Sequence, residues 1–279
     1  MERGVPVHVP QLNAKADRSP IGARILSPCE SLDDIKVMLA GHSNASSVIR
    51  ALVAEEDSGG TVALARRHGL GGVIQKIVRP EYFELVRELG RSRAVALIWQ
   101  GNQANGNFLL QVGQPLDVIP CGYPETALVR GCRLVPEEAV RARFAGSVDE
   151  LGALLAALGR PAGCRRYILS IQPPLGDNAL IRERLHTEPH YAALAARFGL
   201  KIDEIPITAP SVRRKLWFIL MVMYREVAER YGALFVDVPP EAFDERGFLR
   251  LDLAASDVTH PGLAYGRLMI AQLAAHLGS

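Results

Sequence analysis

The sequence predicts an α/β fold in which a parallel sheet of about five strands is covered by helices on both faces. Two observations predict it. Short, continuous apolar runs alternate with segments of helical spacing along most of the chain, as expected for strands buried on both faces of a sheet. Of the 279 residues, 48% are hydrophobic and 22% are charged, which is enough apolar material for a sizeable core and excludes a disordered chain.

The expected strands are apolar runs that stop at turn-forming or polar residues. The first, Ile35–Ala40, stops at Gly41, and the most apolar one, Arg93–Trp99, leads directly into a polar cluster. Since parallel neighbours need a crossover segment between them, helices are expected to separate these runs. The remaining expected strands are Thr61–Ala65, Arg166–Ser170 and Ala233–Val236.

Segments with apolar residues every three or four positions separate the strands and are expected to form the covering helices. Near the start of the longest one, Arg213–Lys215 is interpreted as a solvated face. The apolar run Leu216–Met223 is interpreted as core, with the contact face of a homo-oligomer as the alternative. The expected helices are Ser43–Glu55, Pro80–Leu89, Ser147–Leu158, Pro210–Tyr231 and Leu263–Leu277.

The first 20 residues contain three prolines and little periodicity. We therefore predict an N-terminal arm over residues 1–34 and a single α/β domain over residues 35–279, a length that suits one large domain.

The charge balance argues against nucleic acid or an anionic membrane as a partner, because 32 basic residues offset 30 acidic ones for a net charge of +2. There is no signal-peptide pattern, and no run reaches the ~18 apolar residues of a membrane span. We therefore expect a soluble, cytoplasmic protein with reduced cysteines. The cysteines form no C-x-x-C pair, which argues against a zinc ribbon: Cys29, Cys121, Cys132 and Cys164.

Ligands of parallel α/β sheets bind at the carboxyl ends of the strands, and three polar clusters are expected there. The first is Gly41–Ala45. A serine on a strand-to-helix turn exposes its hydroxyl, and its own N–H lies at a helix N-terminus that favours an oxyanion, so Ser43 is a candidate nucleophile. The alternative is a serine that caps the helix. The cluster is neither a G-x-S-x-G elbow, since residue 45 is Ala, nor a P-loop.

The second cluster, Gln100–Asn105, follows the strand Arg93–Trp99. Side-chain amides at this edge can donate hydrogen bonds into a pocket without carrying charge, which is how an oxyanion hole uses them. The alternative is a loop of turn-forming residues.

The third cluster, Asp257–Pro261, precedes the last helix. An aspartate three residues before a histidine can hold Nδ1 of the imidazole and leave Nε2 free to take a proton. The alternative is a set of helix-capping residues. No metal site is expected, because a metal would need a third ligand and only His42 is suggested by the chain order.

Taken in order, a serine after the first strand, an asparagine after a middle strand and D-x-x-H before the last helix resemble the SGNH (GDSL-type) hydrolase superfamily. The most specific match is Asp257-x-x-His260 followed by Tyr265 and Gly266. The middle block, G-N-Q-A-N, resembles the GGN-type block of some uncharacterised bacterial members.

The resemblance implies a single three-layer α/β/α sandwich, flavodoxin-like in its layers. It implies that Ser43 is the nucleophile, that Asn102 donates a side-chain hydrogen bond to the oxyanion, that His260 is general base and then general acid, and that Asp257 holds its tautomer. The implied reaction is ester hydrolysis through an acyl-enzyme, with no cofactor.

Two positions depart from the family pattern. His42 replaces the aspartate of the G-D-S block, and Gln100 replaces a glycine two residues before Asn102. Both are candidates for contact with the substrate. The glycine amide that the family's second block adds to the oxyanion hole has several candidates, and the sequence does not choose between them: Gly59, Gly60, Gly69, Gly71 and Gly72.

The resulting prediction is a serine esterase that acts on a small-molecule acyl or acetyl ester. Its activity should rise with pH as His260 loses its proton, near the ordinary value of ~6.5. Two alternatives remain: an acyltransferase that uses the same triad, and a catalytically silent module that binds a carbohydrate or a partner.

Overall fold

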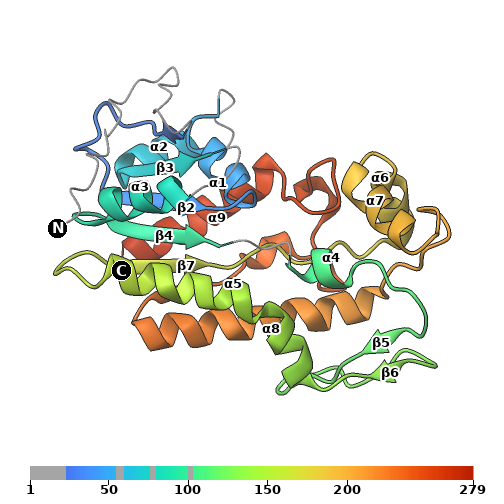
Figure 1. Ribbon diagram of the computed structural model, residues 1–279. Coiled ribbons are helices and arrows are strands. Elements are labelled where there is room, and N and C mark those ends of the chain that lie inside the picture. The colour runs from blue at the N-terminus through green and yellow to red at the C-terminus, as the bar shows by residue number, and fades with distance from the viewer. Residues whose placement is uncertain (1–22, 55–59, 76–79, 100–102, 279) are drawn as a thin grey trace.

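A computed structural model describes residues 23–54, 60–75, 80–99 and 103–278. Its centre is a six-stranded sheet in the order β1-β3-β2-β4-β7-β8 (Figure 1). The last five of these are mutually parallel, and β1 pairs antiparallel with β3 at the edge. The predicted fold class is thus confirmed. The strands are β1 (Arg24–Leu26), β2 (Val37–Gly41), β3 (Leu70–Ile74), β4 (Ala94–Ile98), β7 (Arg166–Leu169) and β8 (Leu234–Val236).

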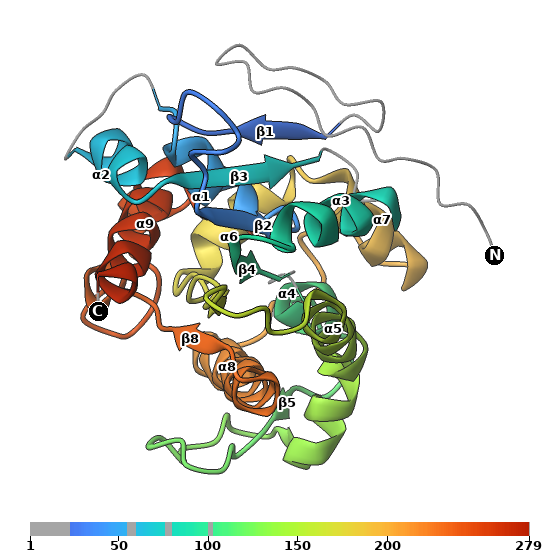
Figure 2. The same cartoon turned by 90° about the vertical axis from the view of Figure 1, so that its left-hand side faces the viewer.

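Helices cover both faces of this sheet, and Figure 2 shows α2 and α9 on one side of the strands with α3 and α5 on the other. A hydrophobic core lies on each face of the sheet, and successive residues of a strand point into opposite cores. Met38 and Ala40 pack with α3, α5 and α8, whereas Val37 and Leu39 pack with α1, α2 and α9. The helices are α1 (Ala45–Ala51), α2 (Thr61–Arg67), α3 (Pro80–Gly90), α5 (Glu137–Leu158), α8 (Pro210–Tyr231) and α9 (Leu263–Leu277).

One predicted strand is wrong. Thr61–Ala65 lies in helix α2, and the strand beside β2 is β3, which starts at Leu70. Its two glycines make β3 resemble a turn in the sequence, but both are packed: a Cβ on Gly71 would lie 2.6 Å from Ile35, and one on Gly72 would lie 2.6 Å from Ile49. The strand omits side chains at these positions because neighbours occupy the space.

The predicted arm is too long. Residues 24–26 form β1, and the Ser27 hydroxyl donates to the Leu70 carbonyl at 2.8 Å. Arg93 donates to the Leu32 carbonyl at 3.0 Å, so residues 23–34 are attached to the sheet. The sequence does not indicate this attachment, because a three-residue edge strand is too short to show a periodic pattern of apolar residues. Residues 1–22 lie outside the described part of the chain.

The first turns of α8 also differ from the prediction, because Arg213 and Lys215 are buried rather than solvated. Lys215 forms an ion pair with Asp117 at 3.0 Å, and both side chains are 0% exposed. This pair attaches the segment between Phe108 and α5, in which Asp117 lies, to the rest of the domain. The run after it is core, as predicted: Leu216, Ile219, Leu220, Met221 and Met223 are buried.

Several elements that the sequence did not indicate gather beyond the carboxyl ends of the strands, around the right-hand side of Figure 1. These elements are α4 (Gln103–Phe108), β5 (Leu116–Asp117), β6 (Arg133–Leu134), α6 (Asn178–Leu185) and α7 (Pro189–Arg197), with 3₁₀ helices at Pro240–Ala242 and Leu251–Leu253.

Among the described residues, no helix combines the length and apolar character needed to span a membrane.

Candidate active site

Ser43 lies on the turn between β2 and α1, as predicted, and its side chain is exposed. The preceding Gly41 is required there, because a Cβ would lie 1.8 Å from the Ile98 carbonyl oxygen of β4. The turn then winds into α1, with the Ser46 N–H donating to the Ser43 carbonyl at 3.0 Å. The close approach of two strands therefore fixes where this serine emerges from the sheet.

The structure brings Asp257 and His260 together on a loop, residues 255–260, called here the histidine loop. Nδ1 of His260 lies 3.0 Å from Oδ2 of Asp257. The other carboxylate oxygen accepts the N–H groups of Thr259 at 2.8 Å and His260 at 2.7 Å. Both side chains are about a third exposed. The Asp257 carboxylate thus holds the backbone of its own loop through hydrogen bonds and orients the imidazole.

This geometry shifts both pKa values. Burial by itself raises the pKa of Asp257, but hydrogen bonds from His260 and Thr259 outweigh burial and bring it well below the usual range. The hydrogen bond to Asp257 raises the pKa of His260 above 6.5, with burial opposing and the charges of Asp257 and Glu188 adding to the rise. At neutral pH Asp257 is therefore a carboxylate.

Gln172, just after β7, connects the serine turn to the histidine loop. Its Nε2 donates to the Thr259 carbonyl at 2.7 Å and lies 3.5 Å from Oδ1 of Asn44. The residues next to Ser43 and His260 are thereby joined through one amide. Nε2 of His260 is buried and has no hydrogen-bond partner among the described residues, so it is not bonded to the Ser43 hydroxyl. Catalytic hydrogen bonds often tighten only in the Michaelis complex.

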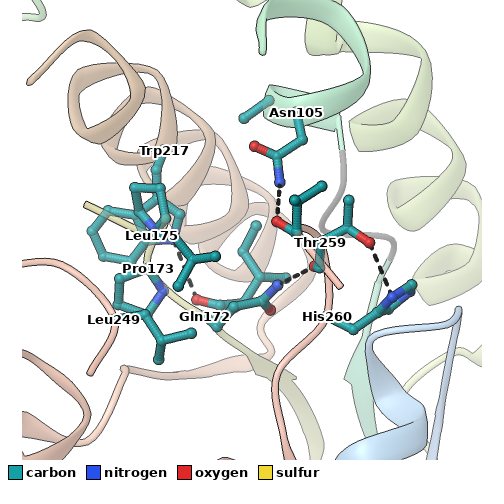
Figure 3. A pocket seen from close by; sticks show the side chains of 12 residues that line it. Asn105, Gln172, Pro173, Leu175, Trp217, Leu249, Thr259 and His260 are labelled. Atoms are coloured by element: carbon teal, nitrogen blue, oxygen red, sulfur yellow. Dashed lines mark hydrogen bonds between the residues drawn. The ribbon is translucent and has the colours of Figure 1, made fainter. Parts of the chain in front are cut away.

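Of the second cluster, Gln100 and Asn102 lie outside the described residues. Asn105, in α4, donates from Nδ2 to the Val258 carbonyl at 3.3 Å, as Figure 3 shows. The chain after β4 therefore meets the histidine loop, which is the neighbourhood in which the sequence placed this cluster.

His42, a candidate for contact with the substrate, packs among aromatic side chains. Its ring packs edge-on against Trp99 at 4.5 Å between centroids and also contacts Phe83. It does not line the cavity beside His260. Burial lowers the pKa of His42 while the charge of Glu150 opposes the shift, so the imidazole is neutral at pH 7. A neutral imidazole can pack among aromatic rings, whereas the charged carboxylate of an aspartate at this position could not. This difference accounts for the contact of His42 with Trp99.

A cavity of about 30 Å³ lies against the histidine loop. Figure 3 shows Pro173, Leu175, Trp217 and Leu249 on one side of Gln172, and Thr259 and His260 on the other. Such a volume holds roughly one water or a group the size of a methyl. Its wall combines apolar side chains with a few polar ones: Ile171, Pro173, Pro174, Leu175, Trp217 and Leu249 against Asn105, Gln172, Thr259 and His260.

None of the described candidate glycines lies at the carboxyl end of β3. Gly71 and Gly72 are inside the strand, Gly69 precedes it, and Gly60 is the N-cap of α2. Gly59 lies outside the described residues.

Sequence reasoning missed three residues that hold the histidine loop: Gln172, Arg184 and Glu188. For Gln172 a signal existed, because an amide directly after a predicted strand lies at the ligand-binding edge. The other two lie on α6 and at the start of α7, where nothing in the sequence indicated a site. Within the described residues, no group of three histidine, cysteine, aspartate or glutamate side chains could hold a metal ion.

No protein-family model and no curated protein sequence matches the chain. Among solved structures, a GDSL-like lipase from Bacteroides thetaiotaomicron is similar at 12% identity and a TM-score of 0.42, covering 88% of this chain and 89% of that one. An enzyme from the metagenome of Lake Arreo, Spain, the alpha/beta hydrolase LAE5, is similar at 17% identity and a TM-score of 0.43, covering 88% and 95%. The chain is also similar to Axe2, an acetylxylan esterase from Geobacillus stearothermophilus, at 13% identity and a TM-score of 0.45, covering 88% and 94%.

Proposed function

We propose that this chain is a serine esterase of the SGNH type that hydrolyses a small acyl or acetyl ester without a cofactor. The observation that carries the proposal is the Asp257–His260 pair. Its Nδ1 is held by the carboxylate at 3.0 Å, its Nε2 is unpaired among the described residues, and Gln172 ties its loop to the residue after Ser43. A paired Nδ1 and a free Nε2 are what a general base for a serine hydroxyl needs.

In the proposed reaction, Oγ of Ser43 attacks the ester carbonyl while Nε2 of His260 takes the hydroxyl proton. The Ser43 N–H and the Asn102 side chain stabilise the oxyanion. The imidazolium, stabilised by Asp257, then gives its proton to the departing alcohol and leaves an acyl-serine. Water, deprotonated by His260, attacks this ester; the intermediate collapses, the acid leaves and Ser43 recovers its proton.

The size of the cavity supports a small acyl group. A volume of about 30 Å³ beside His260 has room for a methyl group, and Trp217 forms part of its wall. Trp217 is held in place by its Nε1, which donates to the Ile171 carbonyl at 3.3 Å. An acetyl ester therefore suits the size of this cavity.

The first test is labelling with a fluorophosphonate probe, which forms a covalent bond only with an activated serine. We expect the wild type to be labelled and Ser43→Ala to be unlabelled and inactive on p-nitrophenyl acetate, because the nucleophile is gone. The matched control is Ser46→Ala, one turn along and outside the proposed machinery, which should be labelled like the wild type. A folded wild type that takes no label contradicts the proposal and favours the silent binding module.

A further inference from the structure

The main-chain polar groups of the histidine loop are held from outside by charged side chains of two helices. Arg184 of α6 donates from one guanidinium nitrogen to the Ala255 carbonyl at 2.8 Å and to the Asp257 carbonyl at 3.0 Å. Glu188 accepts the Val258 N–H at 2.9 Å. Hydrogen bonds that involve a charged group are the stronger ones, so these contacts restrain the loop on either side of Asp257.

The position of Glu188 is informative. It is the N-cap residue of α7, and its side chain makes no hydrogen bond to an N–H of its own helix. Its carboxylate instead bonds to Val258, 70 residues away in the chain. The Glu188 carboxylate is therefore committed to the loop that carries His260 and not to its own helix.

Three charged side chains belong to the histidine loop or bond to it, and the charges of two of them, Asp257 and Glu188, act on His260. Asp257 belongs to the same loop, Glu188 comes from the start of α7, and Arg184 comes from α6. Of the two groups outside the loop, Glu188 raises the pKa of His260 by its negative charge. Arg184 directs its donors to backbone carbonyls. The two side chains therefore have separable effects. Glu188 restrains the loop and raises the pKa of His260, whereas Arg184 only restrains the loop.

We infer that Arg184 and Glu188 are positioning residues that hold the histidine loop so that His260 meets Ser43, and that Glu188 also tunes the pH range in which His260 serves as a base. This inference rests on the proposed esterase function. The helices α6 and α7, which the sequence did not indicate, would then serve to support the general base and not the sheet.

The test compares Arg184→Met, Glu188→Ala and Glu188→Gln by measuring kcat and KM for p-nitrophenyl acetate across pH. A misplacement of catalytic groups by about 1 Å costs roughly 100-fold in rate, so Arg184→Met and Glu188→Ala should lower kcat about 10- to 100-fold with little change in KM. In Glu188→Gln the side-chain amide oxygen still accepts the Val258 N–H, so this variant should recover most of kcat. Because the charge is lost, the acid limb of both Glu188 variants should move to lower pH, whereas Arg184→Met should leave that limb in place.

The control is Glu183→Ala, an exposed position on α6, which should behave as the wild type. Thermal unfolding separates loss of fold from loss of positioning. If Arg184→Met and Glu188→Ala match this control in kcat, or if the acid limb does not move in Glu188→Gln, the inference is wrong. Failure of the proposed function has a different signature, namely a folded wild type that takes no fluorophosphonate label.

Discussion

His260 has its hydrogen-bonding capacity divided between structure and chemistry. Nδ1 is occupied by Asp257 at 3.0 Å and also lies 3.0 Å from the Thr259 hydroxyl, which itself bonds to the same carboxylate. Nε2 is left over and buried. A residue with one nitrogen fixed has a fixed tautomer, and this is the property on which the proposed base depends.

The raised pKa of His260 gives a testable pH dependence. A base must be unprotonated, so kcat/KM should rise with pH through the pKa of His260, and that midpoint should lie above 6.5. The hydrogen bond and charge of Asp257 cause most of the rise. Hence Asp257→Asn should move the midpoint to lower pH and also lower kcat by roughly 10³- to 10⁴-fold, because the amide favours the wrong tautomer.

A pH–rate profile of the wild type and of Asp257→Asn on p-nitrophenyl acetate checks this. A wild-type midpoint well below 6.5, or an unmoved midpoint in the variant, would contradict the assigned pair.

The elements that carry the site are held by a few buried polar side chains. Arg213, in the first turn of α8, donates to the carbonyls of Thr208 and Leu175, each at 2.7 Å, and burial lowers its pKa to about 10. Leu175 is part of the cavity wall. The start of α8 therefore positions the chain after β7, which contributes Gln172.

The buried ion pair between Lys215 and Asp117 sets an element-scale prediction. Lys215→Met leaves the Asp117 carboxylate buried without its cation, and breaking a buried pair on one side costs roughly 3–5 kcal/mol. The matched control is Arg87→Met, because the Arg87–Glu84 pair on α3 is 41% and 57% exposed, and such pairs contribute ~1 kcal/mol or less. Urea unfolding of both variants measures the two costs. Equal losses would show that the buried pair has no special structural role.

At the scale of the whole molecule, the serine turn and the histidine loop are brought together by the packing of α1 against α9. The helix that starts two residues after Ser43 packs against the helix that starts three residues after His260. Gly266 allows this, since a Cβ there would lie 2.3 Å from the Ser47 carbonyl oxygen. The distance between the two halves of the site is therefore governed by helix packing rather than by either loop.

Gly266→Ala should push α9 away from α1. Overpacking of this kind costs roughly 1–3 kcal/mol, and kcat should fall in the same variant because Ser43 and His260 separate. The control is Gly146→Ala on α5, which has open space around it and should stabilise by about 0.5–1 kcal/mol through helix propensity. Thermal unfolding and turnover of p-nitrophenyl acetate are the measurements. A Gly266→Ala enzyme with wild-type kcat would show that the site tolerates this displacement.

The sequence by itself determined the alternation of strands and helices, the bounds of α8 and α9, and the candidates Ser43, Asp257 and His260, because these depend on local periodicity and on residues close together in the chain. Only the tertiary structure decided the rest. β1 and β3 were missed because a three-residue edge strand and a glycine-rich strand lack a local signal. Gln172, Arg184 and Glu188 acquire their roles only through contacts at separations of 70 to 128 residues. Packing across such separations is set by the fold, and the local sequence does not record it.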